Sequence, residues 1–436
     1  MRGLAWWWLH ATAGTLRGKF WQDGRPGWME QSPRREGERM RLAVLLLCLA
    51  VSTASFADER FTGFDHFVSQ YQSARAEARP ELTRAFVEWQ QAHGGFPIIE
   101  PTGHAVFFYV GTGQEKDVRL IGEFRRAGYY NHAWDPAGVP LVRAAEGGAV
   151  FFARLSFEKD ARLEYKFVID GAEKPDPLNP RTYDGAIVGV VSEVSMPGYV
   201  PPREAVARED VPKGSLHVVE EPWATPKVTI YLPAKYDAAK RYPVIYTPDG
   251  AAWINHLKLP IILDNLIAEG SIEPVIAVMM DPTADRSNWY QFNPDYLSYL
   301  EKVVAYVDSH YSTRARAEDR LHLGTSAGGR IALYVGLERP QLFRNVALLS
   351  PSLMGPPSYY EPWFSRRRRP NPKLRIWLSA GSYEGYIVQD TQMLETYLKS
   401  VGLKPKTVYT HQGHTLGAWR YLAPDVLRYF LGTKPR

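Results

Sequence analysis

The fold of this chain is decided by the stretch RLHLGTSAGGRIALYVGLERPQLFRNVALLSPS, residues Arg320 to Ser352. It reads as a strand, a sharp turn, a helix and a second strand, with Ser326 at the turn inside the pattern Gly324-Thr-Ser-Ala-Gly328. A serine held on such a turn needs small neighbours, because a side chain at Gly324 or Gly328 would collide with the adjoining strand and helix. The pattern alone arises by chance, but this context favours a nucleophile elbow over a glycine-rich turn.

Strands alternate with helices throughout the C-terminal half, residues 215–436. Continuous apolar runs, which predict strands covered on both faces, occupy 242–247, 274–280, 346–350 and 374–378. Helical spacing separates them at 257–269, 294–311 and 388–401. This alternation predicts an α/β fold with a mostly parallel sheet, whose reactive loops gather at the carboxyl ends of the strands.

The N-terminal half has a different period. Residues 58–100 have helical spacing that Pro80 breaks into two helices, and residues 101–200 change to a period of two with turn residues between six or seven short strands. The second segment predicts a small all-β sandwich that precedes the catalytic domain. Residues 201–214 are polar and proline-rich and read as a linker.

The first 57 residues indicate export. Residues 40–57 combine a basic start, an apolar run and small residues at Ser55 and Ala57, the pattern of a signal peptide cleaved after Ala57. Residues 1–39 show no periodicity and are expected to be a mis-assigned upstream segment. The location predicted for the mature protein is periplasmic or secreted.

The charge of the mature chain argues against a nucleic-acid partner. Residues 1–57 hold eight of the 52 Lys and Arg and four of the 47 Asp and Glu, so 44 basic residues remain against 43 acidic ones. The single cysteine, Cys48, lies in the signal peptide, which excludes a disulfide in the exported protein. No later segment has the length and apolarity of a membrane span. The oligomeric state is not indicated.

A serine nucleophile needs a base, and the base needs an acid to orient it. Two histidines follow Ser326, and His414 is preferred over His411 because Gly413 lets its ring turn back over the elbow. Glu384 lies in the loop after the strand at 374–378, which is the position of the acid in this architecture. Asp390 is the rival acid, although it falls near a helix start, where a carboxylate can simply stabilise the helix.

The tetrahedral intermediate of such a reaction requires backbone N–H donors. One is expected from Ala327, the residue after the nucleophile, and the other from Ala251 in the turn after the strand at 242–247. Trp253 in the same turn and Arg286 after the next strand are candidate substrate-binding residues.

Several stretches of the C-terminal half together resemble the putative-esterase family, which includes enterochelin esterases, feruloyl and acetyl-xylan esterases and mycolyltransferases. They are Tyr231 to Tyr236, Tyr242 to Ile245, Asp249-Gly250, Asp281 to Arg286, Gly324 to Gly329, Gly381 to Glu384, Gly413-His414 and Trp419-Arg420. The resemblance covers about half of the chain and implies an α/β-hydrolase fold and ester hydrolysis.

The N-terminal strands are similar to immunoglobulin-like early-set modules, through Gly122 to Phe124, Tyr165 to Gly171 and Asp176 to Pro180. Such modules sometimes bind carbohydrate through exposed aromatic residues, here Tyr129, Tyr130 and Trp134, which can equally pack against the protein. A sandwich ahead of the hydrolase is the layout of enterochelin esterases and favours that member of the family. The residues 287–290 and Thr415 depart from the family pattern and leave the substrate open.

An insert at 354–372 follows a central strand and is expected at the rim of the site. Its four arginines, Arg366 to Arg369, read first as a solvated loop, and the sharper hypothesis is that they attract an anionic ester substrate. Tyr359, Tyr360 and Trp363 would then stack on aromatic rings of that substrate.

These features predict an exported serine carboxylesterase with the triad Ser326, His414 and Glu384. An enterochelin-type siderophore trilactone is the leading substrate, and feruloyl or acetyl esters of plant polysaccharide are the alternative. A carbohydrate-binding or interaction protein with an inactive hydrolase domain is the alternative outside enzymes. No metal or organic cofactor is implied, because the chain has no HExxH pattern and no cysteine ligand.

Overall fold

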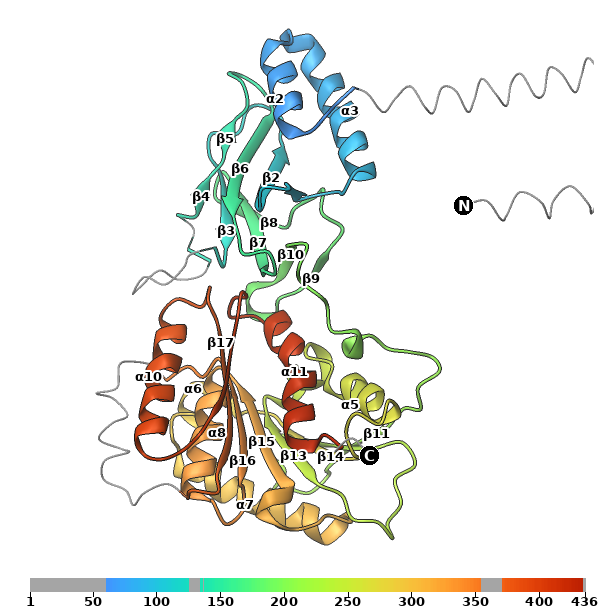
Figure 1. Ribbon diagram of the computed structural model, residues 1–436, viewed down its shortest axis with the longest axis vertical. Helices are drawn as coiled ribbons and strands as arrows, with labels where there is room; N and C mark the ends of the chain where they lie inside the picture. The colour runs from blue at the N-terminus through green and yellow to red at the C-terminus, as the bar shows by residue number, and fades with distance from the viewer. Residues whose placement is uncertain (1–59, 125–133, 136, 354–370, 434–436) are drawn as a thin grey trace, which may run out of the picture. The chain divides into compact units, whose positions relative to one another are not determined.

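A computed structural model describes residues 60–124, 134–135, 137–353 and 371–433 (Figure 1). The predicted signal peptide, Tyr129, Tyr130 and the insert residues Tyr359, Trp363 and Arg366 to Arg369 lie outside these ranges. Phe61–Arg436 form one compact unit. None of the helices within the described ranges is long and apolar enough to cross a membrane.

Two helices begin the described chain, α2 (Phe64–Ser73) and α3 (Arg79–Ala92), with a 3₁₀ turn η1 (Ala76–Ala78) between them. Pro80 lies in the first turn of α3, where its missing N–H costs no helical hydrogen bond, so the expected break becomes the start of the second helix. The rings of Phe67 and Phe86 stack with centroids 4.0 Å apart. Both rings contact Phe108, which joins the helices to the neighbouring sheet.

The N-terminal β part (residues 98–195) contains two antiparallel sheets. One has the order β1-β2-β6-β5, with β1 (Ile98–Ile99), β2 (His104–Val110), β6 (Val150–Ser156) and β5 (Val142–Arg143). The other has the order β4-β3-β7-β10-β9, and β8 also pairs with β7. Its strands are β4 (Val139–Pro140), β3 (Val118–Gly122), β7 (Arg162–Ile169), β10 (Val190–Ser195), β9 (Thr182–Asp184) and β8 (Ala172–Lys174). Phe107 and Phe151 of the first sheet share a core with Leu120 and Phe167 of the second.

The C-terminal α/β part (residues 215–433) is built on one sheet of eight strands. Its order is β11-β12-β14-β13-β15-β16-β17-β18. The strands are β11 (Ser215–Val218), β12 (Val228–Leu232), β13 (Val244–Pro248), β14 (Ile276–Met280), β15 (Arg320–Thr325), β16 (Asn345–Leu349), β17 (Arg375–Gly381) and β18 (Lys406–Thr410). Pairing is antiparallel from β11 to β14 and parallel from β14 to β18, so the sheet is mixed but mostly parallel, as expected.

Helices cover both faces of this sheet (Figure 1). They are α4 (Gly250–Asn255), α5 (Leu259–Ala268), α6 (Arg286–Trp289), α7 (Pro294–His310), α8 (Ala327–Glu338), α10 (Tyr386–Ser400) and α11 (Leu416–Leu431), with 3₁₀ turns η2 (Ala186–Val188), η3 (Arg203–Ala205) and η4 (Ala317–Asp319) elsewhere. Ile245 of β13 packs with α4, α5 and α11 on one face. Val244 and Tyr246 pack with α7 and α8 on the other, as strand alternation requires.

The turn at Ser326 has the constraint expected of it. Ser326 has φ 54° and ψ −123°, between the end of β15 and the start of α8. A Cβ at Gly324 would lie 1.9 Å from the carbonyl oxygen of Gly328, and one at Gly328 would lie 3.0 Å from Pro248 Cγ. The collision expected at Gly324 is therefore confirmed and is made with backbone, which cannot yield without moving α8.

We expect Gly324→Ala to destabilise the fold by about 3 kcal/mol or more, because the new methyl group overlaps a helix carbonyl. Gly329→Ala is the matched control, since its Cβ would meet nothing closer than 3.2 Å. Urea unfolding of the two variants measures the difference. Equal stability of both would contradict the close approach of β15 and α8.

Candidate active site

Three side chains from three loops form a continuous hydrogen-bonded chain. His414 Nε2 lies 2.9 Å from Ser326 Oγ, and His414 Nδ1 lies 3.1 Å from Glu384 Oε2. Ser326 lies at the β15–α8 turn, Glu384 between β17 and α10, and His414 between β18 and α11. The three residues singled out in the sequence are thus brought together, although 88 positions separate the serine from the histidine.

The carboxylate of Glu384 is held from several sides. It accepts hydrogen bonds from Ser350 Oγ (2.6 Å) and from the Gly381 N–H (2.8 Å), and its side chain is only 1% exposed. Ser350 Oγ in turn accepts from Trp419 Nε1 at 2.9 Å. The histidine side chain is 25% exposed, so the imidazole is reachable from solvent while its carboxylate partner is not.

The loops that carry the acid and the histidine are joined through their backbones. The Ser382 N–H donates to the Thr410 carbonyl (2.8 Å), and the Tyr383 N–H donates to the Gln412 carbonyl (3.2 Å). A Cβ at Gly381 would lie 2.0 Å from the Gln412 carbonyl oxygen, so glycine is needed at this crossing. These contacts fix the separation of the carboxylate from the imidazole.

The two alternative residues have other surroundings. Asp390 is buried in α10, and the carboxylate that bonds His414 is that of Glu384. His411 follows β18, and its Nδ1 lies 2.7 Å from Asp160 Oδ1 of the N-terminal β part. Its carbonyl accepts from the Arg162 N–H at 3.1 Å. His411 therefore joins the two parts of the protein and is not the base that bonds Ser326.

One of the two expected oxyanion donors requires correction. Ala327 is the first residue of α8, where a backbone N–H has no partner within the helix and is available to a ligand. The Ala251 N–H, by contrast, donates to Asp281 Oδ1 at 2.6 Å. This bond could not be predicted from the sequence, because Asp281 is 30 positions away and directly follows the neighbouring strand β14. Ala251 is not a free donor in this structure.

The prediction that Trp253 binds substrate was wrong. Its side chain is wholly buried in the core between α4 and α5, so it cannot reach a substrate. Arg286 is 39% exposed, and its guanidinium binds both oxygens of Asp249 (2.7 and 2.8 Å) and lies over the Tyr290 ring. This pairing holds the turn after β13, while substrate contact by Arg286 stays a prediction.

Comparison with known proteins identifies the α/β part. Residues 221–419 match the family described as "Putative esterase". The match covers 199 of the 436 residues, and this esterase-family domain is similar to the members of that family. The esterase-family domain therefore contains Ser326, Glu384 and His414 together with the sheet that positions them.

Curated relatives match over part of their length. The chain is 27% identical to the iron(III) enterobactin esterase of Escherichia coli O6:H1 over 56% of this chain and 64% of that protein. It is 28% identical to an endo-1,4-beta-xylanase/feruloyl esterase of Xylanibacter ruminicola over 36% of this chain and 24% of that protein. The chain therefore spans less than two thirds of either relative.

A solved structure shares the fold over a longer stretch. The ferric enterobactin esterase of Salmonella typhimurium superposes with a TM-score of 0.66 at 18% identity, covering 79% of this chain and 98% of that one. The fold that the two share is thus larger than the esterase-family domain alone.

A buried glutamate beside the site was missed in the sequence. Glu123, directly after β3, is 1% exposed, and neither of its carboxyl oxygens makes a hydrogen bond of normal geometry within the described residues. Burial raises the pKa of Glu123 well above its usual range, and the nearby carboxylates of Glu164 and Glu384 raise it further. Arg162 and the His414 N–H lower the pKa, but their effect is smaller. The only signal was a charged residue at the end of an apolar strand.

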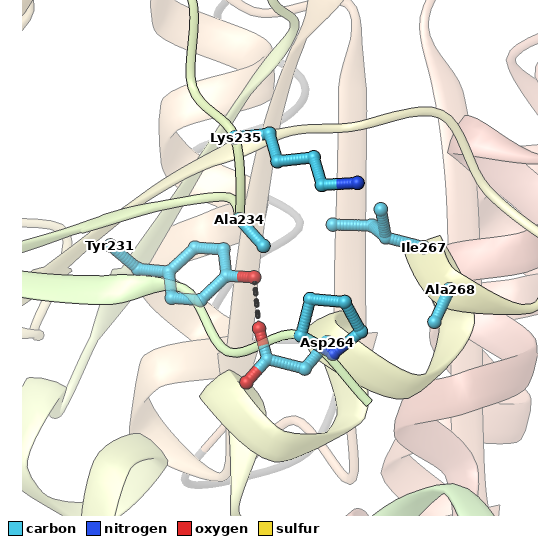
Figure 2. Close-up of a pocket in the computed structure, with 7 residues that line it drawn as sticks. Tyr231, Ala234, Lys235, Asp264, Ile267 and Ala268 are labelled. Atoms are coloured by element: carbon cyan, nitrogen blue, oxygen red, sulfur yellow. Dashed lines mark hydrogen bonds between the residues drawn. The ribbon is translucent and has the colours of Figure 1, made fainter. Parts of the chain in front are cut away.

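A pocket away from Ser326, Glu384 and His414 lacks the groups of an active site. It is a pocket of about 280 Å³ between β12 and α5, lined by Pro212, Tyr231, Ala234, Lys235, Asp264, Ile267 and Ala268. Figure 2 shows that the Tyr231 hydroxyl donates to Asp264 Oδ1, at 2.6 Å. These polar groups satisfy each other, and none of the three residues of the hydrogen-bonded chain lines the pocket.

The burial of Glu123 predicts an unusual dependence of stability on pH. Because its pKa is higher in the folded than in the unfolded chain, the folded state binds more protons, and the stability gained at low pH is lost as the pH rises. We expect wild type to lose stability relative to Glu123→Gln as the pH is raised from about 4 towards 8. Urea unfolding across this range measures the effect.

Glu115→Gln is the control with the opposite sign. Burial acts to raise the pKa of Glu115, but hydrogen bonds from Thr112 and Gly113 outweigh it and lower the pKa. Its contribution to stability is therefore present above the usual pKa and lost as the pH falls. A difference between wild type and Glu123→Gln that does not change with pH would contradict the environment described for Glu123.

Proposed function

We propose that this protein is a serine carboxylesterase with an α/β-hydrolase catalytic domain. The observation that carries the proposal is the hydrogen-bonded chain from Ser326 Oγ through His414 to Glu384. Nucleophile, base and orienting acid each stand in the order and at the distances that acyl transfer to serine requires. The match of residues 221–419 to the esterase family supports the same reaction.

In the proposed mechanism, Ser326 Oγ attacks the carbonyl carbon of the ester while His414 Nε2 takes its proton. Glu384 stabilises the imidazolium, and the oxyanion accepts a hydrogen bond from the Ala327 N–H. Collapse of the tetrahedral intermediate breaks the bond to the alcohol, which leaves with the proton from His414. Water then releases the acyl group from Ser326 by the same steps, again with His414 as base.

The substrate class proposed is the trilactone of a catecholate siderophore. The iron(III) enterobactin esterase matches over a larger share of this chain than the feruloyl esterase does, 56% against 36%. The two antiparallel sheets of the N-terminal β part support the proposal of an immunoglobulin-like module in front of the hydrolase. The signal-peptide pattern at 40–57 adds the proposal that the enzyme is exported.

We expect Ser326→Ala to abolish hydrolysis of p-nitrophenyl butyrate and labelling by a fluorophosphonate probe, because the nucleophile is removed. Glu384→Gln is expected to lower kcat by a factor on the order of 10⁴, because an amide favours the wrong tautomer of His414 and cannot stabilise the imidazolium. Asp390→Asn is the matched control and should stay within a few-fold of wild type. Equal rates for wild type and Ser326→Ala would instead favour a binding protein with an inactive hydrolase domain.

The substrate proposal is tested by direct competition of ester classes. We expect kcat/KM of the mature protein to be highest for a ferric catecholate trilactone, compared with feruloylated xylan and acetylated xylan at the same enzyme concentration. Ser326→Ala provides the blank for each substrate. A clear preference for either xylan ester would assign the enzyme to the carbohydrate esterases and remove the siderophore proposal.

A further inference from the structure

Two ionisable side chains of the N-terminal β part reach the loop that carries His414. The first is Arg162 of β7, which is 1% exposed. Its guanidinium donates to Glu164 Oε1 (2.7 Å), to Glu193 Oε2 (2.9 Å) and to Thr415 Oγ1 (3.2 Å). A Cβ at Gly417 would lie 2.3 Å from Arg162 Nη1, so the guanidinium lies directly on the start of α11.

The second is Glu123, which contacts the other end of the same loop. A Cβ at Gly413 would lie 1.8 Å from Glu123 Oε2 and 2.7 Å from its Cβ. The carboxyl therefore packs flat against the residue that precedes His414. Glu123 is buried and its carboxyl oxygens make no hydrogen bond of normal geometry within the described residues, so its presence at this place does not follow from stability.

The loop from Gly413 to Gly417 is thus enclosed between Glu123 at one end and Arg162 at the other. Both glycines are needed because each of these side chains occupies the space of a Cβ. Thr415, between them, accepts from Arg162 and also caps α11 by accepting from the Ala418 N–H. The backbone on each side of His414 is therefore fixed by groups outside the esterase-family domain.

We propose that Glu123 and Arg162 are positioning residues that hold the imidazole of His414 in reach of Ser326. The inference rests on the proposed function, because it concerns the same reaction. Small displacements of a catalytic group, on the order of 1 Å, lower the rate by about 10²-fold. The N-terminal β part accordingly completes the active site rather than only adjoining it.

The protonation state of Glu123 decides which substitution should preserve its support of the His414 loop. Its pKa is raised by burial and by Glu164 and Glu384, while Arg162 and the His414 N–H act in the opposite direction. Glu384 is the carboxylate that bonds the imidazole, and the raised pKa favours the protonated form of Glu123. An amide of the same shape therefore matches it, whereas a methyl group leaves the loop without support on that side.

The test compares full-length Glu123→Ala, Glu123→Gln and Glu115→Ala with wild type on p-nitrophenyl butyrate. We expect Glu123→Ala to lose about 10-fold or more in kcat with KM nearly unchanged, because the base is displaced and ester binding is not. Glu123→Gln should keep kcat within a few-fold. Glu115→Ala removes a buried glutamate of the same β part whose bonding partners lie in its own loop, and it should leave kcat unchanged.

A double-mutant cycle keeps the inference testable if Glu123→Ala folds poorly. Gly413→Ala places its methyl group on Glu123, so we expect a large loss of kcat that the combination Gly413→Ala with Glu123→Ala partly restores. Additive losses would overturn the inference, as would a wild-type kcat in Glu123→Ala or equal losses in Glu123→Ala and Glu115→Ala. Activity in Ser326→Ala would instead overturn the proposed function, so the two failures are distinguishable.

Discussion

The hydrogen bond between His414 Nε2 and Ser326 Oγ depends on the parallel part of the central sheet. β15, β17 and β18 run in the same direction, so the loops that follow them emerge at one edge. That edge collects a nucleophile, an acid and a base that are far apart in the sequence. The close approach of β15 to α8 at Gly324 then lifts the serine clear of the strand ends.

The central strands, the serine turn and the positions of the acid and base could be predicted, because they follow from the spacing of apolar residues and from local chemistry. Apolar runs identified the central strands, and the elbow pattern with its small residues fixed the place of Ser326. The loop after β17 indicated Glu384, and the neighbouring glycine indicated His414. The structure shows that Gly413 is needed for space, because Glu123 occupies the position of a Cβ there. The sharp start of α3 at Pro80 also follows from a local rule, since proline needs no N–H in the first helical turn.

The remaining features depend on contacts between distant segments, which periodicity does not encode. Trp253 was predicted to bind substrate because it follows the central strand β13, where active-site loops lie. The short helix α4 instead turns its ring into the core. Ala251 was assigned as a donor without knowledge that Asp281, from the next strand, would bind its N–H. Glu123 looked like an ordinary strand-end charge, because its burial arises only when the N-terminal β part contacts the histidine loop.

The backbone hydrogen bonds between the Glu384 loop and the His414 loop have a consequence for motion at the site. Ser382 and Tyr383 are tied to Thr410 and Gln412, so the acid and the imidazole form one rigid unit that spans the ends of β17 and β18. A displacement of either loop therefore moves the carboxylate and the imidazole together. Because Nδ1 of His414 already faces Glu384 Oε2, the tautomer and the orientation of the ring are set before an ester binds.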